Sequence, residues 1–320
     1  MPIIAAPYEL ADPDIYLDLN PVVHREIYLK CEGLNFGGSV KMRAAVAMIS
    51  AAKRAAQIDQ DSVLIESSSG NLGVAISVIA SSMGLGFTCV TDRNCNETTF
   101  KMMRALGTEV VVVEEEDPDG GYLQARIDTV KKLCASDDRY VWLNQYTNEA
   151  NWSVHYASTA PSILKQFPQL DVLFVGVGTG GTAMGCVRYF RDSGASARVI
   201  AIDAVGSVSF GGPKSPRLVP GLGAAVPPPL LDRHVFDDVV HVPELDTIRI
   251  CRFLASKGML FGGSTGTVVS GALCWLSQHD PGRNMRCVCI SADLGERYLD
   301  TVYNDSWVES HFGDQSVRQR

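Results

Sequence analysis

The chain has 320 residues, of which 46% are hydrophobic and 20% charged, with a formal net charge of −8. This length is enough for two lobes, and the composition is that of an ordinary globular protein. The acidic balance argues against nucleic acid or an anionic membrane as the main partner. The N-terminus lacks a signal-peptide pattern, and no apolar stretch reaches membrane-spanning length. Nine scattered cysteines favour reduced thiols and therefore a cytoplasmic location.

Strand-like and helix-like segments alternate along the chain. The predicted strands are "SVLIE", "GFTCVT", "EVVVVE", "DVLFVGV", "RVIAID" and "CVCIS", and helical patterns follow most of them. This alternation predicts an α/β fold with mainly parallel sheets covered by helices on both faces. The stretch "LNQYTNEAN", residues 143–151, is the best candidate for a crossover between two lobes. In the last strand, Cys287 and Cys289 share one face without a companion Cys/His pair, which favours core packing over a metal site.

A single lysine stands out near the N-terminus. In "NFGGSVKMRAAV", Asn35, Gly37 and Gly38 predict a turn, and Lys41 then falls in the first turn of a helix. The helix dipole disfavours a positive charge there, and a dry environment would disfavour it further. Both would lower the pKa of this amine and make it a nucleophile. The alternative is an ordinary solvated lysine.

Two further strand-to-helix junctions are typical of anion sites. "ESSSGNLG" places three serines, Gly70 and Asn71 at a helix start, which favours a carboxylate or phosphate site over simple capping. "VGVGTGGTAMG" is a second such junction, and its G-x-G-x-x-G spacing also fits a dinucleotide-binding protein with Asp203 as the ribose acid. That rival explains neither Lys41 nor the first junction. In "LFGGSTGT", Ser264 is a routine helix cap or a hydroxyl presented to a ligand.

Together these junctions resemble the fold-type II family of pyridoxal-phosphate enzymes, the cysteine synthase group. "NFGGSVKMR" resembles the motif N-P-G-G-S-x-K-D-R, with Met42 in place of the usual Asp, and "SSSGNLG" resembles T-S-G-N-T-G. The resemblance implies a tryptophan synthase β-like fold of two three-layer αβα domains. It implies a large domain of residues 1–35 and 148–320, and a smaller mobile domain of residues 36–147 that carries Lys41.

The resemblance also implies the site residues for pyridoxal 5'-phosphate. Lys41 would be the catalytic Schiff-base lysine, Asn71 the partner of the ring oxygen, and Ser264 the residue at the pyridine nitrogen. The phosphate loop would be Gly178, Thr179, Gly180, Gly181 and Thr182. The substrate carboxylate would be bound by Ser68, Ser69, Leu72 and Gln145, chiefly through backbone N–H groups of the first three. No metal is implied, and a homodimer is expected.

Longer stretches such as "NQYTNEANWSVHY" and "GERYLDTVYNDSW" resemble one branch, the N-(2-amino-2-carboxyethyl)-L-glutamate synthases. This implies a β-replacement in which O-phospho-L-serine, by way of α-aminoacrylate, is joined to L-glutamate, releasing phosphate. The product would supply 2,3-diaminopropionate for a siderophore or peptide natural product. Both substrates are anionic, so local cations are required. Arg126 and Arg217 are the candidates, with ordinary surface arginines as the alternative, and Tyr146, beside Gln145, would donate a hydrogen bond.

Two other functions stay open at this point. A cysteine synthase would use the same cofactor with sulfide as the nucleophile and O-acetylserine or O-phosphoserine as the substrate. A nucleotide-binding or regulatory protein without catalysis would use only the "GVGTGG" loop.

Overall fold

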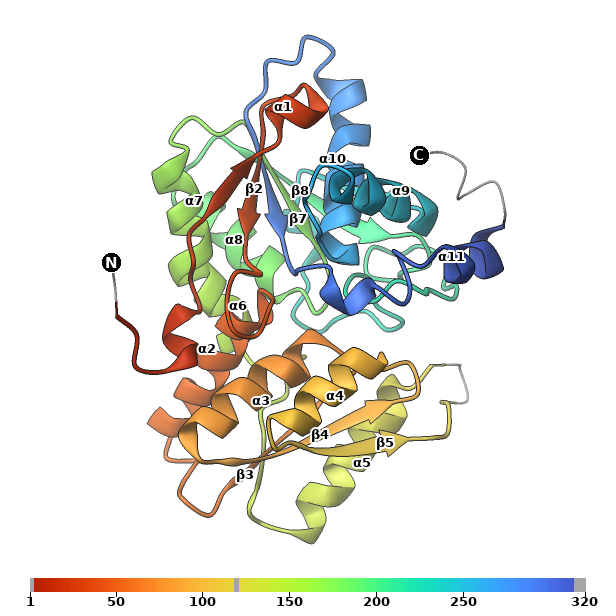
Figure 1. The fold of residues 1–320 in the computed structure, drawn as a ribbon. Helices are drawn as coiled ribbons and strands as arrows, with labels where there is room; N and C mark the ends of the chain where they lie inside the picture. Colours follow the sequence, from red (N-terminus) through yellow and green to blue (C-terminus); the bar gives the residue numbers. More distant parts are fainter. Residues whose placement is uncertain (1–2, 118–120, 314–320) are drawn as a thin grey trace. The chain divides into compact units, whose positions relative to one another are not determined.

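The computed structural model describes residues 3–117 and 121–313. The chain divides into two compact units, each with its own sheet (Figure 1). The first unit holds the described residues of Met1–Asp12 together with Asn35–Asn151. The second unit holds Pro13–Leu34 and the described residues of Trp152–Arg320. The chain therefore passes into the second unit at the end of the "LNQYTNEAN" stretch.

The first unit is built on four parallel strands in the order β5-β4-β3-β6. The strands are β3 (Val63–Ser67), β4 (Gly86–Asp92), β5 (Glu109–Val113) and β6 (Tyr140–Trp142). The helices are α2 (Lys41–Arg54), α3 (Asn71–Met83), α4 (Glu97–Ala105) and α5 (Leu123–Ser136), preceded by the short 3-10 helix η1 (Pro7–Leu10).

Alternation along β3 separates two cores in this unit. Leu64 packs into the larger core with apolar residues of α2, α3 and α4, whereas Ile65 packs with Val130 of α5 on the opposite face. Successive side chains of a strand point to opposite faces, so a parallel sheet buried on both sides needs apolar residues at every position. Figure 1 shows α3 and α4 on one side of this sheet and α5 on the other.

The second unit is built on six strands in the order β1-β2-β10-β7-β8-β9. Only the edge strand β1 is antiparallel to its neighbour. The strands are β1 (Tyr16–Asp18), β2 (Ile27–Cys31), β7 (Val172–Gly176), β8 (Arg198–Ala204), β9 (Asp238–Val242) and β10 (Cys287–Ser291). The helical elements are α1 (Asn20–Val23), α6 (Ala150–Val154), η2 (His155–Thr159), α7 (Ala160–Gln166), α8 (Gly181–Asp192), η3 (Arg233–Val235), α9 (Glu244–Ala255), α10 (Gly263–His279), η4 (Glu296–Tyr298) and α11 (Asp305–Phe312); α6 begins in the first unit and η2 is a π-helix.

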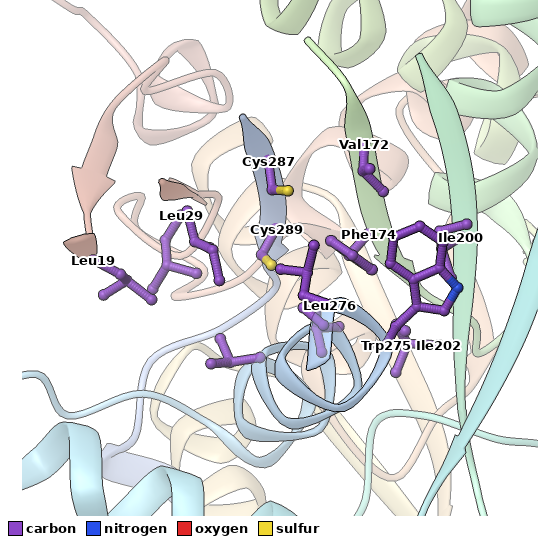
Figure 2. Close-up of a cluster of buried hydrophobic side chains, with 14 of the residues drawn as sticks. Leu19, Leu29, Val172, Phe174, Ile200, Ile202, Trp275, Leu276, Cys287 and Cys289 are labelled. Carbon is purple, nitrogen blue, oxygen red and sulfur yellow. The ribbon is translucent and has the colours of Figure 1, made fainter. Parts of the chain in front are cut away.

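The second sheet also has a core on each face. On one face, Cys287 and Cys289 are fully buried beside Phe174 of β7 and Trp275 of α10. Figure 2 shows these four side chains. On the other face, Val288 and Ile290 pack with residues of α7 and α8. The expected packing role of the two cysteines is therefore confirmed. Within the described ranges, no helix is both long and apolar enough to cross a membrane.

The N-terminal segment differs from the expected domain boundary. We expected residues 1–35 in the larger domain, but the described part of Met1–Asp12 belongs to the first unit. Asp12 pairs with the buried guanidinium of Arg43 on α2, and Tyr8 packs against the core of the same unit. A buried arginine needs a counter-charge, and here the carboxylate comes from a segment about 30 residues away.

Candidate active site

Lys41 is the first residue of α2, as the sequence predicts. The preceding turn is closed by a hydrogen bond from Gly38 N to Asn35 O, and Gly38 has a φ of 64°, which favours glycine. Met42 replaces the usual acidic residue and is fully buried in the apolar core. Its Cε lies 3.1 Å from the position of a Cβ at Gly37. Met42 is thus a packing residue that holds the turn beside Lys41.

The serine loop after β3 is held by its own hydrogen bonds. The Ser68 backbone N–H donates to Val90 O (3.0 Å), and the Ser68 hydroxyl accepts from the N–H groups of Gly70 and Gly73. We expected the Ser68 N–H to bind substrate, but here it extends the ladder to β4. Ser69 and Leu72 stay predicted carboxylate contacts. Asn71 is the first residue of α3, so the loop opens directly onto a helix start.

Gln145 lies against this loop from the segment after β6. Its side-chain amide donates to Ser67 O (3.0 Å), and its backbone N–H donates to Glu66 Oε2 (3.2 Å). Glu66 is fully buried and also accepts from Ser67 N (2.8 Å). Burial raises the pKa of Glu66 to about 7, although both N–H donors favour the ionised form. Two loops from distant parts of the first unit are thereby joined.

Arg126 is buried rather than solvated. It lies on α5 and pairs through Nη1 with Asp92 Oδ2 at the end of β4 (3.0 Å). No described residue accepts a hydrogen bond from its buried Nε–H group. Burial raises the pKa of the nearby Tyr146, and the positive charge of Arg126 opposes that rise. Lys131 and Lys132, farther along α5, are exposed.

The second unit carries the predicted phosphate loop at the start of α8. Gly180 is the N-cap residue of this helix, has a φ of 90° and has no side chain with which to cap the first backbone N–H groups. The Thr182 hydroxyl is held 3.2 Å from Nε2 of the buried His155, whose Nδ1 lies 2.8 Å from Thr159 Oγ1. This segment is therefore a helix N-terminus suited to bind a phosphate.

Ser264 lies in the first turn of α10 and is buried. A Cβ at Gly221 would lie 2.2 Å from Ser264 Oγ, so only a glycine lets the 221 turn approach this hydroxyl. Gly221 also has a φ of 111°, which favours glycine independently. The Gly221 turn and the Ser264 hydroxyl therefore lie close together, and neither carries a charge.

Arg217 is held within its own loop. Its Nη1 donates to the backbone carbonyls of Gly206 (3.0 Å) and Ala224 (3.1 Å), and burial lowers its pKa. These bonds give it a role in shaping the loop, and contact with substrate stays a prediction. Asp203 is fully buried and accepts from Ala204 N (2.8 Å). The dinucleotide hypothesis requires this carboxylate to be accessible to a ribose, and the buried Asp203 is not accessible.

The described residues supply the groups that pyridoxal phosphate needs. In the second unit, the start of α8 can bind the phosphate and the neutral hydroxyl of Ser264 can face the pyridine nitrogen; in the first unit, Lys41 can form the covalent link. The fold and these groups are those of an α/β enzyme that works with this cofactor.

Comparison with known proteins agrees. The family model "Pyridoxal-phosphate dependent enzyme" matches residues 16–293, so the chain belongs to that family. It is 41% identical over 287 residues to an N-(2-amino-2-carboxyethyl)-L-glutamate synthase of Cupriavidus metallidurans, covering 88% of this chain and 84% of the relative. A synthase of the same name from Ralstonia nicotianae is 40% identical over 285 residues, with the same coverage. The crystal structure of a hydrogen sulfide-producing enzyme from Fusobacterium nucleatum superposes with a TM-score of 0.87 at 28% identity, covering 93% of this chain and 99% of that one.

Three supporting residues were missed by reasoning from the sequence. Glu66, Asp92 and His155 bond to predicted site residues but do not themselves complete a recognisable motif. Glu66 lies in "ESSSGNLG" and His155 lies in "NQYTNEANWSVHY", two stretches that carry the family resemblance. An acid and an imidazole in these stretches could have indicated supporting residues. Asp92 directly follows the predicted strand "GFTCVT" and offered no signal beyond its charge.

Proposed function

We propose that this enzyme replaces the phosphate of O-phospho-L-serine with the amine of L-glutamate, giving N-(2-amino-2-carboxyethyl)-L-glutamate. The observation that carries the proposal is the 41% identity, over 88% of the chain, to a synthase of that name. The product would supply 2,3-diaminopropionate to a siderophore or peptide natural product. The expected homodimer and cytoplasmic location stay predictions.

Each site residue has a defined task in this reaction. Pyridoxal phosphate, when bound, supplies an electron sink for negative charge at the substrate Cα. With the cofactor bound, the Nζ amine of Lys41 would hold it and, once free, would take the proton from the substrate Cα. The loop at Ser69 and Leu72, with Gln145, binds the α-carboxylate. Ser264 leaves the ring nitrogen without a strong acid beside it, which favours prompt departure of the leaving group.

Two anionic substrates need positive partners in an acidic protein. Arg126 is the preferred candidate because its guanidinium has N–H groups beyond the one that meets Asp92. Tyr146 is its neighbour and, with a raised pKa, keeps its phenolic proton as a hydrogen-bond donor. Arg217 is the weaker candidate because two backbone carbonyls already occupy its Nη1.

A sulfide-using cysteine synthase is the second candidate, favoured by the likeness to the hydrogen sulfide-producing enzyme. To distinguish the two activities, the purified enzyme is incubated with O-phospho-L-serine and either L-glutamate or sulfide at matched concentrations. The products are then identified by mass spectrometry. We expect the glutamate adduct with phosphate release. Cysteine as the main product, with no glutamate adduct, would replace the proposal by the alternative. O-acetyl-L-serine in place of phosphoserine tests the leaving group in the same assay.

A further inference from the structure

The buried carboxylate of Glu66 joins the two segments that the proposed function assigns to the substrate carboxylate. It is 0% exposed at the end of β3, directly before the serine loop. One oxygen accepts from Ser67 N (2.8 Å), and the other accepts from Gln145 N (3.2 Å), 79 residues later in the chain. A buried carboxylate is costly to desolvate, so its bonds must offset that cost.

Further bonds hold the same junction from both sides. The Gln145 side-chain amide donates to Ser67 O (3.0 Å), and Gln145 O accepts from Asn151 Nδ2 (2.7 Å). Gln145 is therefore fixed through its N–H, its C=O and its side chain. The Ser68 N–H and hydroxyl are also engaged, so the first part of the loop has little freedom. A site so constrained presents its remaining N–H groups in one geometry.

We propose that Glu66 is a positioning residue that sets the substrate-carboxylate site by joining the serine loop to the Gln145 segment. It acts through the backbone and does not itself touch the substrate. The inference rests on the proposed function, because it takes Ser69, Leu72 and Gln145 as the carboxylate contacts. Preorganised donors bind a carboxylate more tightly because ordering them at the moment of binding costs free energy.

Glu66→Gln is the sharpest substitution. It keeps the volume but replaces one acceptor oxygen by an NH2 group, which would face a backbone N–H. The holoenzyme is titrated with O-phospho-L-serine and with O-phospho-L-serinamide, which lacks the carboxylate charge, and the absorbance change of the bound cofactor reports binding. We expect the variant to bind the acid about 10-fold more weakly, the loss of about 1.4 kcal/mol. Binding of the amide should change by less than about 3-fold, and kcat at saturation should fall less than kcat/KM.

Two controls separate positioning from general damage. Thr108→Val removes a buried hydrogen bond to Ser77 Oγ (2.6 Å) in the same unit, outside the site, and should lower stability without changing the acid-to-amide ratio. Glu97→Gln changes an exposed glutamate paired with Lys101 and should change neither quantity. If Glu66→Gln does not fold, Asn151→Ala loosens the same Gln145 backbone from its carbonyl side, and the same shift in ratio is expected.

The outcomes distinguish this inference from the proposed function. A wild-type enzyme that binds the acid and the amide equally would overturn the carboxylate-site assignment itself. A wild-type preference for the acid that persists unchanged in a folded, cofactor-loaded Glu66→Gln would overturn only the role of Glu66. An unchanged ratio in Asn151→Ala, where Glu66→Gln is unfolded, would do the same.

Discussion

At the scale of single residues, burial decides what a charged group can do. Arg126 and Asp92 form an ion pair in which both side chains are largely buried, unlike the exposed pair of Arg139 and Asp137. An exposed pair contributes little to stability, whereas a buried guanidinium with spare N–H groups is a strong anion-binding group. This contrast makes Arg126 the more informative target.

Arg126→Lys should weaken the use of phosphoserine or glutamate while the cofactor remains bound. A lysine can keep one contact with Asp92 but cannot reproduce the planar fork of the guanidinium. We expect kcat/KM for the affected substrate to fall roughly 30- to 150-fold, at about 2–3 kcal/mol for a charged hydrogen-bonding partner. Steady-state kinetics on both substrates measures this. Arg139→Lys is the matched control, and a change below about 3-fold for both substrates in Arg126→Lys would show that Arg126 serves structure alone.

Lys41→Ala should abolish turnover and the covalent link to the cofactor without unfolding the protein. Lys41 begins α2 and is not part of the apolar core, so truncation leaves no large cavity. Borohydride reduction followed by peptide mass spectrometry should place the cofactor mass on Lys41 in the wild type and nowhere in the variant. Turnover at the wild-type rate would reject the assignment, and circular dichroism checks the fold.

At the scale of elements, the start of α8 depends on how closely that helix approaches η2. A Cβ at Gly185 would lie 2.3 Å from Trp152 O and 2.6 Å from His155 Cβ, so the helix can lie this close only with glycine there. The same close approach brings His155 within reach of Thr182. Packing in the helix interior thus determines the geometry of the predicted phosphate loop.

Gly185→Ala should destabilise the protein and weaken cofactor retention. Overpacking against backbone atoms costs about 1–3 kcal/mol, more than the ~1 kcal/mol that alanine gains in a helix. Gly271→Ala in α10 is the comparison, because the nearest atoms to its Cβ belong to the side chains of Ile202 (2.8 and 2.9 Å) and Val242 (3.1 Å) and not to the backbone. Urea unfolding and dialysis measure the two effects. If Gly185→Ala is as stable as Gly271→Ala, the close approach does not control the loop.

At the scale of the whole molecule, a single buried acid should shape the dependence of stability on pH. The pKa of Glu66 is about 7 in the folded protein because burial disfavours its charge, against a usual value of 4.5. The folded state therefore holds a proton that the unfolded state loses, and stability from this group falls as pH rises from 4.5 to about 7. Above that range its contribution is constant.

Comparison of the wild type with Glu66→Gln isolates this contribution. The difference in unfolding free energy should move in favour of the variant by on the order of 2–3 kcal/mol between pH 4.5 and 7, at about 1.4 kcal/mol per pH unit. Urea unfolding at a series of pH values measures it, and Glu97→Gln is the exposed control. A pH-independent difference would mean that Glu66 is ionised throughout, held so by its N–H donors.

The sequence by itself was enough to predict the α/β class, most strands and the four loop-to-helix junctions in their order. These features are local: the turn before Lys41 needs a glycine at Gly38, and the loop before α8 needs one at Gly180, since both have positive φ. Alternating and continuous apolar runs are also local features, and they predict buried strands. The shortest strands, such as β6 with three residues, are too brief for any period to show.

Tertiary structure alone decided which charges are buried and which partners they meet. The sequence does not show that Arg126 meets Asp92, that Glu66 meets the backbone of Gln145, or that Asp12 pairs with Arg43 and so draws the N-terminal segment into the first unit. Each contact joins residues about 30 to 80 positions apart. Desolvation, and with it the pKa of a group, depends on every segment packed around that group, and no local pattern contains that information.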